Sequence, residues 1–239
     1  MLDYVGIVLV ATAMAVLLAV VICTIPVSLR IRLIVAGAGG AWAGVAIAFA
    51  TAGKLGGPIT LGILAGVPLV AAATLAIAFP GVRSALLAIP LPLVIGANVF
   101  RLEGVFFLAL ASAGRLGGPF PQSAGWGDII VGALAIPAAF LAMRTSANDA
   151  RILIWNVLGV LDLVTAVALG ITSGNGSPLQ LIHAGAGSAA IQALPWSLIP
   201  TVLVPLFLIG HGIVFAHARA AASKQRNVSM GARAMRRPA

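Results

Sequence analysis

Titratable side chains interrupt otherwise apolar stretches at three places. Arg101 and Glu103 lie in "NVFRLEGVFF", Asp162 lies in "WNVLGVLDLVTA", and His211 lies in "LIGHGIVFAH". A charge at membrane depth is costly, so such residues mark functional sites by default. Two carboxylates, an arginine and a histidine in a medium of low polarity suit proton relay or the binding of a polar head group.

These residues need partners on other helices. Arg101 and Glu103 are two positions apart, about 200° around a helix, so they do not pair with each other. Asp162 and His211 are the expected partners, on helices that reach a similar depth. The alternative is that the ion pairs only fix the helix register. The predicted central polar and proton-exchange site consists of Arg101, Glu103, Asp162, His211, Asn98 and Asn156.

The composition defines the elements that must position this site. Hydrophobic residues make up 61% of the 239 positions, 8% are charged, and the mean hydropathy is +1.14. Soluble domains carry about 25% charged residues. A spanning helix needs about 20 mainly apolar residues. The sequence therefore predicts an all-α polytopic membrane protein, a seven-transmembrane-helix bundle, with spans over 4–25, 31–52, 60–80, 90–113, 126–143, 151–172 and 196–218.

The bundle is predicted to be a single domain over residues 1–218. The uncharged segment 173–195 either lies in the membrane interface or covers one end of the bundle. Residues 219–239 are predicted to be a basic cytoplasmic tail without regular structure, which contacts anionic lipid head groups. The first apolar run has no Lys or Arg before it, so we interpret it as a retained span rather than a signal peptide.

The basic residues predict the orientation. Lys54 and Arg115 fall on one side of the predicted topology, and eleven other basic residues fall on the opposite side. Cytoplasmic loops are enriched in Lys and Arg, which predicts an N-out, C-in protein. The net charge of +9 is then mostly a topology signal, and a nucleic-acid partner is not expected. The Ala- and Gly-rich composition favours a bacterial inner (plasma) membrane. The eleven residues are Arg30, Arg32, Arg83, Arg144, Arg151, Arg219, Lys224, Arg226, Arg233, Arg236 and Arg237.

One turn occurs twice in the sequence. "FATAGKLGGP" at 49–58 matches "LASAGRLGGP" at 110–119, which predicts a parallel duplication of the helical hairpins 2–3 and 4–5. Glycine after a helix and proline at the start of the next account for the motif by turn chemistry. The alternative is an anion site at the positive helix ends beside Lys54 and Arg115. Asp128, in "GWGDIIVG", is expected to open the fifth span near the same outer face, so the outer-face candidates are Asp128, Lys54 and Arg115.

Several cofactor chemistries do not fit the sequence. A retinal Schiff base needs a lysine within a span, whereas Lys54 lies in a turn and Lys224 in the tail. With Cys23 alone there is no thiolate metal cage, and no local motif supports a zinc site. The serine-nucleophile pattern G-x-S-x-G does not occur. Bis-histidine haem is disfavoured because the three histidines lie in different parts of the predicted topology: His183 in the outer loop, His211 within the last span and His217 at its inner end. We expect neither a cofactor nor a metal.

The leading interpretation is a small integral membrane binding or transport protein, proton-coupled through its central polar site. Arg101 would hold an anionic group or balance a carboxylate, Glu103 or Asp162 would exchange a proton, and His211 would tune the exchange. The ligand would be small and polar or anionic. A membrane-embedded enzyme acting on a lipid or isoprenoid is the first alternative, although the sequence favours a non-enzymatic role. The second is a homo-oligomer or a structural subunit of a larger membrane complex, joined through the small-residue series Gly37, Gly40 and Gly44.

Overall fold

The computed structural model describes residues 1–55 and 57–235. Seven helices among these residues are long and apolar enough to cross a membrane, and this part of the chain contains no strand. The prediction of an all-helical chain with seven candidate spans is confirmed. The elements are α1 (Leu2–Thr24), α2 (Leu29–Thr51), α3 (Pro58–Ala78), α4 (Pro80–Leu87), α5 (Leu91–Gly96), η1 (Ala97–Gly104), α6 (Val105–Ser112), α7 (Phe120–Ala142), α8 (Ala150–Thr172), η2 (Ala189–Gln192), η3 (Ile199–Leu203) and α9 (Val204–Met235).

The boundaries differ from the sequence-based expectation at two places. The helix α7 begins at Phe120, whereas 126 was expected, because Pro119 and Pro121 occupy helix-starting positions and the polar "FPQSAGW" stretch is already helical. The prediction of a tail without regular structure is wrong for 219–235, where α9 continues to Met235. Alanine, lysine, glutamine and arginine in this stretch are strong helix formers, so the helix extends beyond the apolar span.

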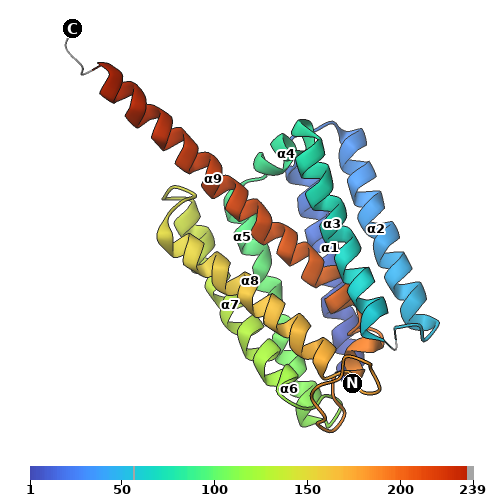
Figure 1. Cartoon of the computed structure of the whole chain (residues 1–239). Coiled ribbons are helices and arrows are strands. Elements are labelled where there is room, and N and C mark those ends of the chain that lie inside the picture. Colours follow the sequence, from blue (N-terminus) through green and yellow to red (C-terminus); the bar gives the residue numbers. More distant parts are fainter. Residues whose placement is uncertain (56, 236–239) are drawn as a thin grey trace.

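Burial separates the spans into an inner and an outer group. Between 33% and 56% of each span is buried in the α5–η1–α6, α7, α8 and α9 group. The corresponding values for α1, α2 and α3 are 18%, 17% and 6%. Figure 1 shows α1–α3 on one side of α9, and α5–α8 on the other. A buried polar site is therefore expected in the inner group, while most of the surface of α1–α3 faces outward.

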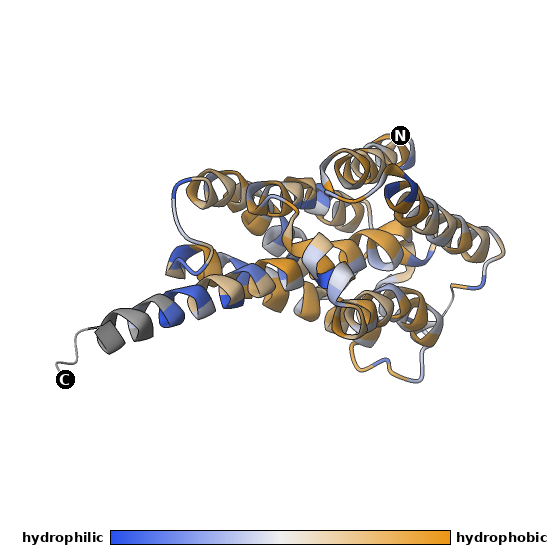
Figure 2. Ribbon diagram, turned by 90° about the horizontal axis from the view of Figure 1, so that it is seen from above, coloured by the Kyte–Doolittle hydropathy of each residue, from blue (hydrophilic) through white to orange (hydrophobic). Residues whose placement is uncertain are grey.

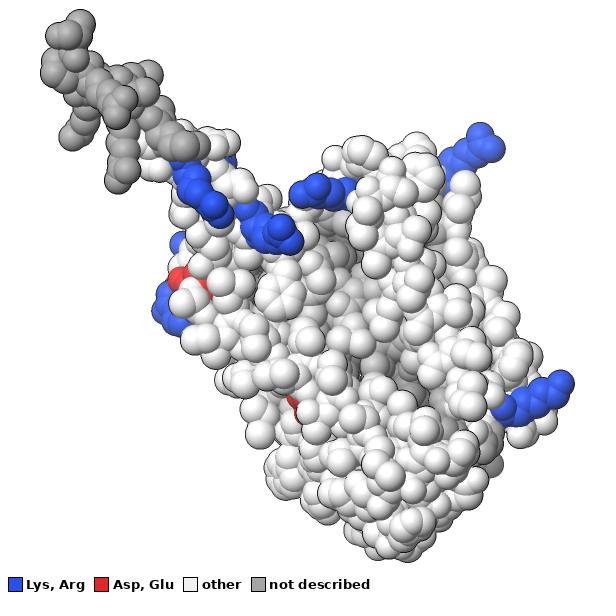
Figure 3. Space-filling view, in the orientation of Figure 1, with Lys and Arg blue, Asp and Glu red and all other residues white. Residues whose placement is uncertain are grey.

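Hydropathy follows this architecture. Apolar residues cover the outer faces of the helices, and hydrophilic residues concentrate in the connections and along the part of α9 that leaves the bundle (Figure 2). Lys and Arg gather at the end from which α9 extends (Figure 3). We call this the basic end, defined by Arg30, Arg83 and Arg144, and the opposite one the loop end, defined by residues 173–198. The N-out, C-in orientation stays a prediction.

The segment 173–198 covers the loop end of the bundle, beside the N-terminus (Figure 1). The backbone N–H of Gly117 donates to the carbonyl of Gly187 at 2.8 Å, which joins the segment to the turn before α7. Trp196 is completely buried, and its Nε1–H donates to Asp3 Oδ1 at 2.7 Å. The segment 173–195 was expected either to lie in the membrane interface or to cover one end of the bundle, and in the structure it covers an end of the bundle.

The two repeated turns have the same local conformation. Gly53 and Gly114 have φ angles of 65° and 70°, in the left-handed region that favours glycine. The following N–H groups, of Lys54 and Arg115, each donate to a carbonyl five residues earlier, at 2.9 and 2.8 Å. The predicted glycine cap is confirmed at both turns. Equal local sequences give equal turns, so the duplication of whole hairpins stays a prediction.

The small-residue face of α2 does not pack within the described chain. A Cβ added at Gly37, Gly40 or Gly44 would meet nothing within 4 Å. The helix instead buries Ala36, Ala43 and Ala46, which lie on the adjacent face. The subunit or homo-oligomer interpretation stays a prediction, and its proposed contact surface is open in the monomer.

Candidate functional site

A 3₁₀ segment in the fourth span positions the arginine. The segment η1 continues α5 and is followed directly by α6. Because a 3₁₀ helix has about three residues per turn, residues three apart share one face. Asn98, Arg101 and Gly104 form such a face, and all three are buried. The face packs against α7, so the Arg101 side chain enters the inner group of helices.

The guanidinium of Arg101 joins three helices. Its Nε–H donates to Asp128 Oδ1 on α7 at 2.7 Å, and its Nη2 pairs with Asp162 Oδ2 on α8. Its Nη1 contacts the carbonyl of Gly159 at 3.2 Å and His211 Nε2 on α9 at 3.3 Å. The Arg101 side chain is completely buried. Charge-assisted bonds of this kind are about twice as strong as neutral ones, and here they connect η1 to α7, α8 and α9.

The hydrogen bonds define the protonation of His211. Arginine has only donors, so His211 Nε2 must accept from Arg101. The proton then lies on Nδ1, which donates to Asn156 Oδ1 at 2.7 Å. The Asn156 amide nitrogen in turn donates to the His211 carbonyl at 3.2 Å, and both side chains are completely buried. The ring of Trp155 lies 5.3 Å from that of His211 and covers this side of the cluster. His211 is therefore a neutral imidazole fixed from both nitrogens.

Glycines make room for the cluster. A Cβ at Gly159 would lie 2.7 Å from His211 Nε2, and a Cβ at Gly127 would overlap the Asp162 carboxylate. At Gly104 it would lie 2.6 Å from Asp128 Cβ. These glycines have helical backbones, so close approach rather than backbone freedom explains them. Any residue larger than glycine at these three positions would fill space that the side chains of the cluster occupy.

The charges in this cluster do not balance. One guanidinium faces the carboxyl groups of Asp128 and Asp162, and the imidazole is neutral. With both carboxyl groups ionised the cluster carries one excess negative charge, which is costly in a region of low polarity. A bound proton or a bound ligand must neutralise this excess negative charge. Asp162 is the more exposed of the two carboxyl groups, at 12% against 9% for Asp128, so we take it as the member that exchanges.

The structure brings together most of the predicted central residues. Arg101, Asp162, His211 and Asn156 are in direct contact, as the expectation of partners on other helices required. Asn98 shares the Arg101 face, but its amide nitrogen donates to the carbonyl of Val94 at 3.2 Å within its own helix. It is adjacent to the cluster rather than part of it.

Glu103 is separated from the cluster. It lies two positions after Arg101, which is about 240° around a 3₁₀ helix, and it faces α1 instead of α7. Among the described residues its carboxyl group has no ion-pair partner. The single central site predicted from the sequence is therefore divided between the two sides of η1.

Asp128 is a member of the cluster that sequence reasoning placed elsewhere. It was expected near the outer interface, at the start of the fifth span. Because α7 begins at Phe120, Asp128 lies eight residues into the helix, which is about 12 Å along its axis. The prolines around Phe120 were the signal for the earlier start. The structure places Asp128 against Arg101, away from the loop end.

The other outer-face candidates, Lys54 and Arg115, lie at the two repeated turns, and an anion site beside them stays a prediction. Arg115 pairs with Asp3 at 2.8 Å, and the two side chains are 37% and 47% exposed. Lys54 is exposed in the first of the repeated turns. Arg115 and Asp3 join the second turn to α1, and Trp196 donates a second hydrogen bond to the same carboxylate. Within the described residues there is also no group of three or more His, Cys, Asp or Glu side chains suited to hold a metal ion.

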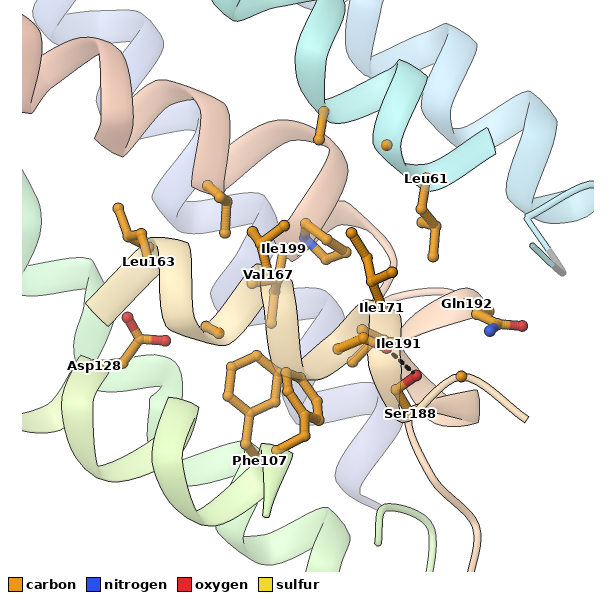
Figure 4. Close-up of a pocket in the computed structure, with 18 residues that line it drawn as sticks. Leu61, Phe107, Asp128, Leu163, Val167, Ile171, Ser188, Ile191, Gln192 and Ile199 are labelled. Carbon is orange, nitrogen blue, oxygen red and sulfur yellow. Dashed lines mark hydrogen bonds between the residues drawn. The ribbon is translucent and has the colours of Figure 1, made fainter. Parts of the chain in front are cut away.

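An apolar cavity of about 70 Å³ leads from the cluster towards the loop end. Figure 4 shows Asp128 at its inner end and Ser188 and Gln192 at the other, with Val167 and Ile191 between them. Helices α3 and α8 contribute much of its wall together with η3, and the surface is hollowed between α3 and α8 (Figure 3). The cavity joins the polar centre to a side of the bundle that faces lipid.

One protein family matches the part of the chain that contains the inner group of helices. Residues 58–219, from the start of α3 to the middle of α9, match a family described as a domain of unknown function (DUF8737). The chain belongs to this family. The matched region includes Arg101, Asp128, Asp162 and His211, while α1 and α2 lie outside it. No curated protein and no solved structure matches the chain. The charged cluster thus lies wholly inside the part of the chain that defines the DUF8737 family.

Proposed function

We propose that this DUF8737 protein is a small membrane binding or transport protein that couples a proton to a small anion. The observation that carries the proposal is a completely buried Arg101 shared by two carboxylates from different helices, with one negative charge in excess. The seven apolar helices support a location in a membrane. We also propose that this membrane is a bacterial inner membrane, with the basic end on its cytoplasmic side and the extension of α9 near anionic lipid.

The coupling follows from competition for the guanidinium. When Asp162 is ionised it occupies Nη2 of Arg101, so an anion finds no free donor there. When a proton binds Asp162, the pair weakens and the excess charge of the cluster disappears. The freed N–H groups can then bind a carboxylate or phosphate, because arginine presents donors that match these groups. Proton and anion therefore bind together. Asp128 and His211 hold the guanidinium in place during the exchange.

Proteoliposomes loaded with a pH-sensitive dye test this function. Small monocarboxylates and inorganic phosphate are added one at a time, and the internal pH is followed. We expect one of these anions to acidify the interior of vesicles with the wild-type protein. The variant Asp162→Asn has a permanently neutral side chain, so it should still bind the anion but no longer move a proton with it.

The matched control is Asp3→Asn, which removes a carboxylate at the loop end and leaves the cluster intact. It should behave as the wild-type protein. If none of the anions moves protons in the wild-type vesicles, or if Asp162→Asn moves them as well as the wild type does, the proposal is wrong.

A second candidate is a membrane-embedded enzyme acting on a lipid or isoprenoid. The observation that favours it is the apolar cavity, which ends at the Asp128 carboxyl group and is bordered by the lipid-facing helix α3. A chain-like substrate could enter between α3 and α8 and place a polar end at Asp128. Mass spectrometry of lipid extracts incubated with the protein distinguishes the two candidates. New lipid products that disappear in Asp128→Asn support the enzyme, whereas unchanged lipids with anion-dependent proton movement support the carrier.

A further inference from the structure

A second cavity lies on the other side of η1. It has a volume of about 220 Å³ and is lined by α1 and the η1–α6 segment. A cavity that holds one water needs about 10–15 Å³ on this scale, so there is room for a much larger occupant. Phe100, Glu103 and Phe106 lie three residues apart and form one wall of what we call the α1 chamber. The 3₁₀ winding that turns Arg101 towards α7 turns this stripe towards α1.

Among the described residues, Glu103 alone brings a charged group to the lining of the α1 chamber. The residue is 8% exposed, and no ion pair neutralises it within the described chain. Asp128 of α7 is the carboxyl group that acts on it electrostatically, and Arg101 is engaged by two other carboxylates. The helices α5 and α6 carry no titratable residue, and α1 contributes none to the chamber wall. A buried carboxyl group without a counter-charge must bind either a proton or a cation.

The chamber opens towards the bilayer. Leu9, Leu102 and Val105 line it and are 42%, 39% and 49% exposed. A strongly hydrated metal cation would lose its water shell on this route, because the walls besides Glu103 offer few oxygen ligands. A cation with a hydrophobic body would lose little, and aromatic faces such as those of Phe100 and Phe106 attract cations. Apolar walls, two aromatic rings and one carboxylate together select for such a molecule.

We propose that the α1 chamber binds a lipophilic organic cation in exchange for a proton on Glu103. The cation enters from the lipid phase between α1 and the η1–α6 segment. Its charge replaces the proton as the neutralising partner of the carboxylate, so the two compete. The affinity for the cation therefore falls as the pH is lowered, by at most one decade per pH unit for a single proton. This site uses neither Arg101 nor Asp162, so it does not depend on the proposed function of the cluster.

Binding of radiolabelled tetraphenylphosphonium to the purified full-length protein in mild detergent tests the proposal. We expect saturable binding that weakens between pH 8 and pH 5. The variant Glu103→Gln should weaken it roughly 30-fold or more, because a buried charge pair loses one partner. Asp3→Asn removes a carboxylate from α1 outside the chamber and should leave the Kd unchanged. Binding that is absent, independent of pH, or equal in Glu103→Gln would overturn the proposal.

A labelling measurement on the wild-type protein avoids any loss of folding in the variant. Dicyclohexylcarbodiimide is an apolar reagent that adds to protonated carboxyl groups in lipid-accessible sites. Mass spectrometry of peptides should locate the adduct on Glu103, and tetraphenylphosphonium should reduce its formation. An adduct that forms equally with and without the cation would contradict the exchange, and so would a Glu103 that stays unmodified in the absence of the cation.

Discussion

The close contact between η1 and α7 makes a sharp prediction at Gly132. A Cβ added there would lie 2.9 Å from the backbone nitrogen of Leu102, 3.2 Å from the carbonyl carbon of Arg101 and 3.2 Å from the carbonyl oxygen of Asn98. All three atoms belong to the backbone, so no side-chain rotation relieves the overlap. In Gly132→Ala the two segments must separate, and the guanidinium of Arg101 moves with its backbone.

The magnitude follows from two opposing effects. Alanine in place of glycine favours a helix by about 0.5–1 kcal/mol. Inserting a methyl group into a packed interface costs about 1–3 kcal/mol. The overlap is therefore the larger effect, and we expect Gly132→Ala to lower the free energy of unfolding by about 1–2 kcal/mol. The control is Gly44→Ala on α2, where a Cβ meets nothing within 4 Å. Only the helix preference acts there, so this variant should be unchanged or slightly more stable.

Reversible unfolding in mixed micelles, titrated with sodium dodecyl sulfate and followed by circular dichroism, measures both free energies. Tight packing at η1 predicts that the two variants differ by about 2 kcal/mol, with Gly132→Ala the less stable. If Gly132→Ala unfolds at the same detergent fraction as Gly44→Ala, α7 and η1 are not in close contact. The positioning of Arg101 inferred from that contact would then also be refuted.

Three further predictions concern single charges. Replacing Arg101 by methionine leaves two carboxyl groups buried without a cation, and unfolding in the same mixed micelles should show a loss of about 3–5 kcal/mol. Asp3→Asn breaks the ion pair with Arg115, in which the Asp3 and Arg115 side chains are 47% and 37% exposed. Thermal unfolding should therefore show a loss of stability below about 1 kcal/mol. A larger loss would mean that solvent does not screen this pair. At the basic end, hydrogen bonds from Arg151 lower the pKa of Asp149, the N-cap of α8. The cap therefore stabilises α8 fully at pH values above the ordinary carboxyl pKa, and this stabilisation is lost as the pH falls through the lowered pKa. Amide hydrogen exchange in the first turn of α8 should accelerate in acid for this reason. The variant Asp149→Ala should abolish that pH dependence.

The sequence contained enough information for the spans and for part of the cluster. Uninterrupted apolar runs predict helices because the bilayer requires them, and the similar depth of Arg101, Asp162 and His211 predicted partners that the structure confirms. Asp128 was misplaced by a helix boundary, since polar residues before it resemble a loop. The identity of the partners depended on where each helix starts, and boundaries are the least certain part of a sequence-based assignment.

Two features had no signal in the sequence pattern. One is the 3₁₀ winding of η1, because nothing in "ANVFRLEG" distinguishes this segment from an ordinary helix. The glycines at 104, 127, 132 and 159 could equally have been caps, bends or open positions. Their role depends on atoms from other helices, and those atoms are known only when the helices are assembled.

The winding of η1 explains why one span serves two sites. In an ordinary α-helix, Asn98, Arg101 and Gly104 would spread over about 120°, since each step of three residues turns about 300°. They could not all face α7 at the short distance that Gly132 permits. With three residues per turn they form one narrow stripe, so the close approach and the buried ion pair occur on the same face. The same three-residue period aligns Phe100 and Glu103 as a second stripe on the other side of η1, on the wall of the α1 chamber. The two aligned stripes are therefore two consequences of one backbone conformation, and an α-helical η1 would spread the residues of both.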